Sequence, residues 1–190
     1  MSRIFWVRHG PTHARTLLGW SDLPADLSDI ARLGRLSAQL PADALVISSD
    51  LDRARATAAA IAGPRPRLPD DADLREMHFG AWEMQAVNAI PDQTRLRAFW
   101  DAPGDVHPPG GESWHDLRAR VDRAVARLCA AHPGRDIVAV AHFGTILSQL
   151  QRATRVSACE AFAQPIDNLS ITELHLRGTG WHAARINHLP

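Results

Sequence analysis

The sequence predicts an α/β fold, a three-layer α/β/α sandwich with a mostly parallel central sheet. Three short apolar runs rich in β-branched residues predict buried strands, at residues 4–7, 44–47 and 136–141. A helical pattern follows each run, and alternating strands and helices are typical of a parallel sheet with helices on both faces. The 190 residues, 45% of them hydrophobic, suit one core. We therefore expect residues 1–190 to form a single domain.

Helices are predicted from the spacing of apolar residues and from end signals. Residues 27–40 carry apolar side chains at helical intervals, and residues 52–61 form an alanine-rich helix that a Gly-Pro pair ends. A longer helix spans residues 113–131, where Ser113 and Asp116 have the spacing of a capping box. These helices would supply the outer layers of the sandwich.

The middle of the chain, residues 64–111, is rich in Pro and Trp and has weak periodicity. We expect loops there, one short helix near residues 93–100, and a cap over one end of the sheet. Nearer the C-terminus, residues 170–176 and 181–186 have the composition of strands. The segment between them contains two glycines, which predicts a hairpin at the sheet edge.

The charge balance excludes partners that a strong overall field would attract. The basic residues number 21 and so do the acidic ones, so we expect neither nucleic acid nor a membrane as a partner. All the basic residues are arginines. A guanidinium group suits phosphate because it can donate two parallel hydrogen bonds. Any anion site must therefore be local.

The spacing of the cysteines and the lengths of the apolar runs argue against a metal-binding, a secreted or a membrane-spanning protein. Cys129 and Cys159 lack the spacing of a zinc site or a disulfide framework, so we expect no metal and no cofactor. The apolar run at the N-terminus is shorter than a signal-peptide core, and no apolar stretch reaches the length of a membrane span. We expect a cytoplasmic protein and leave a homodimer open.

Cationic side chains follow the ends of the three predicted strands. They are Arg8 and His9 after the first strand, Arg53 after the second and His142 after the third. Ligands of open parallel sheets bind outside the carboxyl ends of the strands, so we expect these four groups to converge. Their mutual repulsion favours a bound anion. With phosphate there, a neutral His9 could attack phosphorus while the other three groups hold its oxygens, without a metal.

The same positions carry a family resemblance. Arg8-His9-Gly10-Pro11-Thr12 resembles the RHG-x-T signature of the histidine phosphatase superfamily, also called the phosphoglycerate-mutase-like family. Further motifs of this family are matched, in order along nearly the whole chain, by residues 53–58, 74–83, 110–113, His142 with Gly144, and 168–170. The resemblance implies a phosphoglycerate-mutase-like fold.

The resemblance also implies a role for each matched residue. His9 would become phosphohistidine, and Glu76 would protonate the leaving oxygen and then activate water. The phosphate would be held by Arg8, Arg53 and His142. An acid of this kind must stay protonated near neutral pH, and a partly buried site could raise its pKa in that way. The residues expected to contact the substrate are Thr12, Arg15, Trp20, Trp82, Phe143 and Gly144.

Departures from the family pattern bear on the substrate pocket. Arg15 stands where the family often has Asn, so we expect an altered pocket wall or one more cation for the substrate. Phe143 stands where Gly is common after the second histidine. Glu83 lies close enough to Glu76 in the chain to compete for the role of the acid.

A phosphatase that acts on a small monophosphate ester fits the sequence best. The chain has no Tyr for the substrate grip typical of phosphoglycerate mutases, and no basic residue precedes the turn at residues 110–113 to hold a second phosphate. The chain length, this turn and residues 77–83 look most like the α-ribazole-phosphate phosphatase branch, which acts late in cobalamin assembly and grades into broad-specificity phosphatases. Mutase-type phosphoryl transfer and non-catalytic binding of a phosphorylated ligand remain alternatives.

Overall fold

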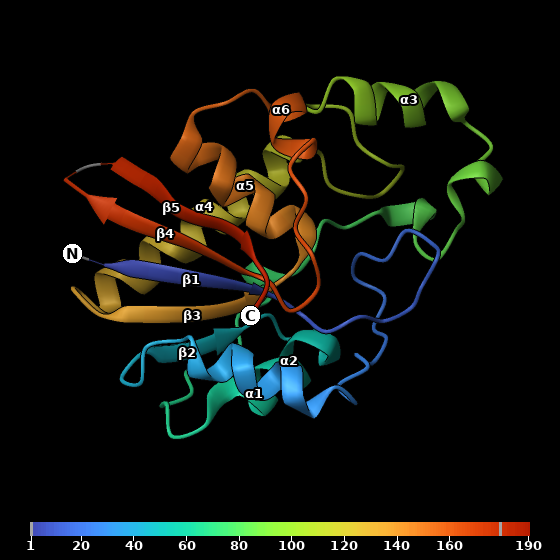
Figure 1. The fold of residues 1–190 in the computed structure, drawn as a ribbon. Coiled ribbons are helices and arrows are strands. Elements are labelled where there is room, and N and C mark those ends of the chain that lie inside the picture. The colour runs from blue at the N-terminus through green and yellow to red at the C-terminus, as the bar shows by residue number, and fades with distance from the viewer. Residues whose placement is uncertain (1, 179) are drawn as a thin grey trace.

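A five-stranded sheet lies at the centre of the computed structural model, which describes residues 2–178 and 180–190 (Figure 1). Its strand order is β2-β3-β1-β4-β5. β1 (Arg3–Arg8), β2 (Leu45–Ser48) and β3 (Asp136–Ala141) are parallel, whereas β4 (Ile171–Arg177) and β5 (Gly180–His188) form an antiparallel hairpin on the other side of β1. The three predicted strands and the hairpin are confirmed, except that Thr179, in the predicted turn, lies outside the described residues.

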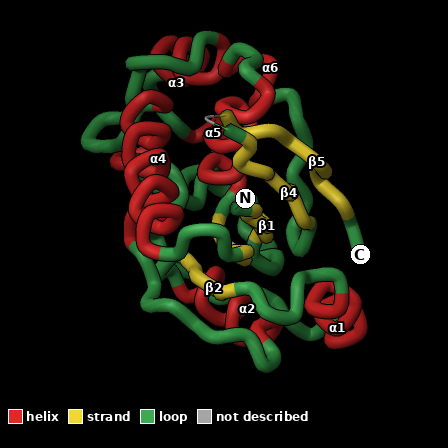
Figure 2. The backbone as a smooth tube through the Cα atoms, turned by 90° about the vertical axis from the view of Figure 1, so that its left-hand side faces the viewer, coloured by secondary structure: helices red, strands yellow, loops and turns green. Residues whose placement is uncertain are grey.

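Helices cover both faces of the sheet, so the predicted three-layer sandwich is confirmed. α1 (Ile30–Ala38) and α2 (Asp52–Ala62) pack on one face, against alternate strand residues such as Val7. α4 (Trp114–Ala131) and α5 (Phe143–Thr154) pack on the other. Figures 1 and 2 show the two pairs on opposite sides of the strands. Each face of the sheet thus has its own apolar core.

Two helix starts show how side-chain caps set the boundaries. α1 begins at Ile30 rather than at the predicted residue 27, because the Asp29 carboxylate accepts a hydrogen bond from the backbone N of Arg32. At α4 the capping box is present as expected: Ser113 accepts from the backbone N of Asp116, whose carboxylate accepts from the backbone N of Ser113.

Residues 64–111 first follow the edge of β2 and then leave the sheet. The backbone of Val46 bonds to Pro66 and Leu68 at 2.9 and 2.8 Å. Beyond that edge come three single turns of 3₁₀ helix and α3 (Gln93–Asp101), which confirms the expected short helix. This segment, green in Figure 1, lies past the carboxyl ends of the parallel strands, near the short helix α6 (Ala158–Phe162). None of the described helices has the length and apolarity needed to cross a bilayer.

Arg65 ties together the ends of α1 and α2. The side chain is 8% exposed, and its guanidinium donates to backbone carbonyls of both helix ends. The acceptors are the carbonyl oxygens of Ser37, Leu40, Pro41, Ile61 and Ala62 and the hydroxyl of Ser37. Helix ends leave carbonyls without intrahelical partners, and one planar cation satisfies those of two helices here.

Arg65→Met should therefore lower the free energy of unfolding by about 2–3 kcal/mol, since it leaves several buried carbonyls without donors. Urea denaturation followed by circular dichroism measures this as a lower midpoint with an unchanged slope. The control is Arg97→Met, at an exposed position of α3, which should stay within about 0.5 kcal/mol of the parent. Equal stability of Arg65→Met and the parent would contradict this role.

Candidate active site

Strand register brings two histidines together at one edge of the sheet. Arg8 pairs with Ala141 in the parallel ladder of β1 and β3, so the next residues, His9 and His142, leave the sheet side by side. Their ring centroids are 5.0 Å apart. Both side chains are buried, with 6% of His9 and none of His142 exposed.

Hydrogen bonds orient His9 so that one ring nitrogen is free to react. Its Nδ1 lies 2.6 Å from the carbonyl oxygen of Gly10, and a nitrogen in that position must carry the proton and donate it. The lone pair is then on Nε2. The backbone is held as well, since the Gly10 N donates to Thr57 Oγ1 and Asn168 Nδ2 donates to the His9 carbonyl. The geometry prepares Nε2 as a nucleophile.

Two arginines reach the same place, and their hydrogen bonds go to backbone carbonyls, while Arg53 Nη1 also lies 4.0 Å from the Asp22 carboxylate. Arg53, on α2, is fully buried and donates to the carbonyls of Ser21 and Gly19 at 3.0 and 2.6 Å. Arg8 donates to the carbonyl of Ile166 at 2.6 Å. Within the described chain the Nε of each arginine and both ring nitrogens of His142 have no hydrogen-bond partner. The cluster therefore offers unused polar groups to a ligand.

Burial and the two arginines keep both imidazoles neutral. Loss of solvation, followed by repulsion from Arg53 and Arg8, lowers the pKa of His9 to about 3. Burial also holds the pKa of His142 well below its usual range, with His9 and the arginines adding to the effect. Buried polar groups without partners cost free energy, and a phosphate dianion would supply acceptors and negative charge together. The site therefore suits the negative charge and the acceptor oxygens of a phosphoryl group.

Glu76 is the carboxyl whose pKa burial raises. It follows the 3₁₀ turn Ala72–Leu74 and is 8% exposed. Burial raises its pKa, although hydrogen bonds from the backbone N of Met77 and Gly144 and the charges of Arg53 and Arg8 act in the opposite direction. Oε1 accepts from both amides, and Oε2 also accepts from the backbone N of Gly144, at 3.1 Å.

Gly144 is required for this arrangement. A Cβ atom at position 144 would lie 2.6 Å from Glu76 Oε1, closer than any stable contact. With no side chain, the first turn of α5 can approach the carboxyl and donate its backbone N–H. The structure therefore brings Gly144 against the acid, where we had expected a substrate contact.

Glu83 is bound quite differently from Glu76. Its two oxygens accept hydrogen bonds from the backbone N of Gly19, Trp20, Ser21 and Phe79. Burial opposes ionisation, but these hydrogen bonds hold the pKa of Glu83 below its usual range. The ionised carboxylate thus fixes the loop whose Gly19 and Ser21 carbonyls hold Arg53. Of the two glutamates, Glu76 has the surroundings of a proton donor.

An apolar pocket adjoins Glu76. Its aromatic walls come from the loop after Glu76, from α3, and from α5 and α6. The lining residues are Glu76, Met77, Phe79, Trp100, Phe143, Gly144 and Phe162. Phe143, an expected substrate contact, lies both on this pocket and 5.4 Å from the guanidinium of Arg8. The pocket therefore lies beside both the acid and the phosphate cluster.

The other expected substrate contacts differ in their positions. Thr12 is half-buried and Arg15 is exposed. Trp20 is half-buried, and its Nε1 donates to the Glu76 carbonyl at 2.8 Å, so it helps to hold the backbone of Glu76 in place. Trp82 is 3% exposed and packs against Phe99 with ring centroids 5.5 Å apart. Trp82 therefore presents almost no surface to a ligand, and its indole belongs to the apolar core.

One buried residue at this site was missed in the sequence. Arg120 of α4 is 7% exposed and donates to the carbonyl oxygens around Glu76. The available signal was its position on the buried stripe formed by Leu117, Val121 and Ala124, where a charge is rare without a partner.

Comparison with known proteins identifies the family. The family model described as histidine phosphatase superfamily (branch 1) matches residues 4–189. The bifunctional protein Rv2228c of Mycobacterium tuberculosis is 30% identical over 93% of the chain, and the chain spans only 51% of that protein. Arabidopsis thaliana metal-independent phosphoserine phosphatase is 29% identical, over 95% of the chain and 79% of the relative. Escherichia coli adenosylcobalamin/alpha-ribazole phosphatase is also 29% identical, over 76% of the chain and 75% of the relative.

Solved structures agree with this result. Bacillus stearothermophilus YhfR superposes with a TM-score of 0.91 at 26% identity, over 100% of this chain and 98% of that one. The mycobacterial glucosyl-3-phosphoglycerate phosphatase Rv2419c, in its complex with VO3, superposes with a TM-score of 0.81 at 28% identity, over 98% of both chains. Because the family model matches nearly the whole of this chain, the chain belongs to branch 1 of the histidine phosphatase superfamily.

Proposed function

We propose that the protein is a metal-independent phosphomonoesterase that works through a phosphohistidine on His9. The observation that carries this proposal is the buried, neutral imidazole of His9 with Nε2 free, beside Arg8 and Arg53 and near a protonated Glu76. Nucleophile, charge stabilisation and acid are the three parts that phosphoryl transfer requires. Membership of the histidine phosphatase superfamily supports the same chemistry.

In the first step, the lone pair of His9 Nε2 forms a bond to phosphorus while the bond between phosphorus and the ester oxygen breaks. The leaving oxygen takes the electron pair of that bond and a proton from Glu76. Arg8, Arg53 and His142 hold the three other phosphoryl oxygens. In the second step Glu76, now ionised, removes a proton from water, whose oxygen attacks phosphorus and displaces His9. The products are an alcohol and inorganic phosphate.

For the substrate we propose a monophosphate whose alcohol carries an aromatic group, with α-ribazole 5′-phosphate as the best candidate. Support comes from the aromatic side chains that line the pocket beside Glu76. The pocket has a volume of only about 30 Å³, room for about one water molecule, so an aromatic leaving group would enter by moving Phe79, Trp100 or Phe162 aside. The name of the Escherichia coli relative points the same way. We also propose that residues 64–111 act as a cap, because Phe79 and Trp100 of that segment line this pocket.

The aromatic pocket predicts a preference between two substrates that differ only in the base. The kcat/KM for α-ribazole 5′-phosphate should exceed that for ribose 5-phosphate by about 10- to 100-fold, because burial of an aromatic ring contributes about 1.5–3 kcal/mol. Release of inorganic phosphate measures both rates, and Trp100→Ala should reduce the ratio. Equal rates on the two esters would exclude an aromatic leaving-group site.

The same assay, extended to further phosphate esters, distinguishes the alternative functions. Phosphoserine and 3-phosphoglycerate belong in it because relatives act, by their names, on phosphoserine and on a phosphoglycerate ester. Conversion of 3- to 2-phosphoglycerate without release of phosphate would indicate a mutase. Tight binding of every ester without turnover would indicate a phospho-ligand-binding protein.

The pKa shifts predict the pH dependence of kcat/KM. His9 stays neutral down to pH values far below 7, so its protonation should not reduce the rate between pH 7 and 5. The rate should fall on the alkaline side, because only protonated Glu76 can donate to the leaving oxygen. Glu76→Gln, measured on the same substrate so that the ionisation of the ester cancels, should lose this alkaline fall. An unchanged alkaline limb in Glu76→Gln would exclude Glu76 as the acid.

A further inference from the structure

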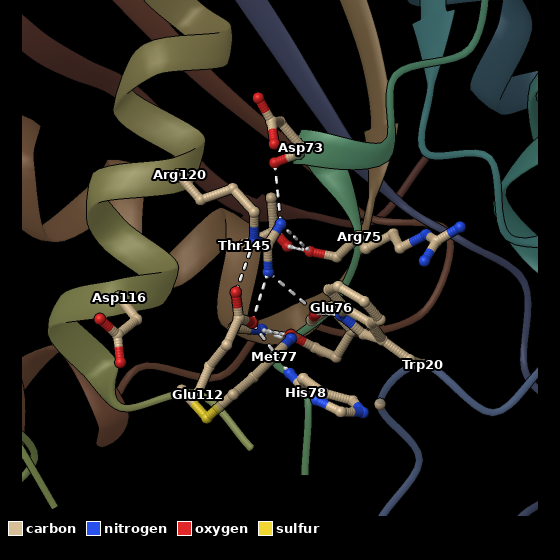
Figure 3. Close-up of polar contacts among 12 residues, drawn as sticks. Trp20, Asp73, Arg75, Glu76, Met77, His78, Glu112, Asp116, Arg120 and Thr145 are labelled. Atoms are coloured by element: carbon tan, nitrogen blue, oxygen red, sulfur yellow. Dashed lines mark hydrogen bonds and ion pairs between the residues drawn. The ribbon is translucent and has the colours of Figure 1, made fainter. Parts of the chain in front are cut away.

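Arg120 uses every donor of its guanidinium, three on the carbonyls of residues 73–76 and two on Glu112. The side chain extends from α4 and is 7% exposed. Figure 3 shows its bonds converging around Glu76. Nη1 donates to the carbonyls of Asp73 and Arg75 at 2.9 and 3.1 Å, and Nη2 donates to the Glu76 carbonyl at 3.1 Å. Nε and Nη2 each donate to Glu112 at 2.7 Å.

Glu112 neutralises the charge of Arg120 and also binds the backbone of His78, just after Glu76 in the chain. Its carboxylate takes both bonds of a fork-to-fork ion pair with Arg120. Oε2 also accepts from the backbone N of His78 at 3.0 Å, and the Glu112 N donates to the His78 carbonyl. The pair therefore clasps residues 73–78, with Glu76 in the middle. A buried ion pair adds little net stability, because the cost of removing both charges from water offsets their attraction.

The two peptide groups that flank Glu76 are the groups most tightly held. The Arg75 carbonyl accepts from Arg120 Nη1 and from Thr145 Oγ1, the latter at 2.8 Å. The Glu76 carbonyl accepts from Arg120 Nη2 and from Trp20 Nε1. Because peptide groups are planar, fixing both of them fixes the direction in which the Glu76 side chain leaves the backbone. The carboxyl is then seated on the backbone N of Met77 and Gly144.

We propose that Arg120, paired with Glu112, is the positioning residue of the proton donor. It holds the backbone of Glu76 so that the carboxyl reaches the leaving oxygen of the ester. This inference rests on the proposed function of Glu76. A misplacement of about 1 Å at a reacting group can cost about 100-fold in rate, so such a residue has a measurable effect without touching the substrate.

Leaving-group dependence tests this role, because protonation matters only when the leaving oxygen is strongly basic. An alkyl phosphate needs the acid, whereas 4-nitrophenyl phosphate releases a stable anion and needs it little. The kcat/KM for each ester reports formation of the phosphoenzyme and not its hydrolysis. Arg120→Met should lose about 10- to 100-fold on the alkyl ester and less than about 3-fold on the aryl ester. Equal losses on the two esters would overturn the proposal.

Arg127→Met is the matched control. Arg127 lies on the same helix and also bonds to the segment before Glu76, through the carboxylates of Asp71 and Asp73 at 2.9 and 2.8 Å. It does not contact Glu76, so both rates should stay near those of the parent. A selective loss on the alkyl ester in Arg127→Met as well would mean that any arginine on this helix produces it, and would overturn a specific role of Arg120.

Glu76→Gln separates this proposal from the proposed function. It should show the selective loss in its strongest form, about 100-fold or more on the alkyl ester. If it shows none, the acid role of Glu76 fails and the inference fails with it. If Glu76→Gln loses more activity on the alkyl ester than on the aryl ester and Arg120→Met does not, the positioning role alone fails.

Glu112→Gln keeps the proposal testable should Arg120→Met not fold. It preserves shape and one acceptor oxygen but removes the charge that orients Arg120. The expected result is a smaller loss in the same sense, about 3- to 10-fold on the alkyl ester, in a protein that melts as one transition. Equal effects on both esters, or no effect, would overturn the positioning role.

Discussion

The structure depends on keeping four cationic or titratable groups buried together at the carboxyl end of a parallel sheet. The two arginines donate hydrogen bonds to the carbonyls of loops, and Arg53 also forms a long ion pair with Asp22 at 4.0 Å. Burial and mutual repulsion make the imidazoles neutral. That arrangement is unfavourable in an empty site and becomes favourable when a phosphoryl group fills it. The same electrostatics creates both the binding site and the nucleophile.

Two glutamates close together in the chain serve this cluster in opposite ionisation states. Glu83 is ionised because four backbone N–H groups bind it, and it orders the loop that holds Arg53. Glu76 is buried with fewer donors, and its pKa is raised. The number of backbone N–H groups that donate to each carboxyl, rather than the residue type, separates the two roles. The hydrogen bond that Arg120 donates to Glu76 goes to its backbone carbonyl, so Arg120 acts on the position of the residue.

Much of this could be predicted from the sequence, for physical reasons. The alternation of strands and helices predicted a parallel sheet. His9 and His142 could be placed together because the residues after parallel strands leave the sheet at the same edge, and the register of β1 with β3 confirms this. Bonds from side chains to distant carbonyls could not be predicted: neither Arg65 nor Arg120 sits in a recognisable motif, since most of their acceptors are backbone atoms. The burial of Trp82 could not be predicted either, because a tryptophan in a pocket wall and one in a core have the same sequence pattern.

The central claim is that phosphorus becomes bonded to His9. The most direct measurement is brief incubation with a radiolabelled phosphomonoester, denaturation in alkali and determination of the label on the protein. Phosphohistidine survives base and is cleaved by acid. The account predicts base-stable, acid-labile label on the peptide that contains His9, and no label on folded His9→Ala. Label retained by His9→Ala, or turnover of the ester by a parent protein that never carries label, would contradict it.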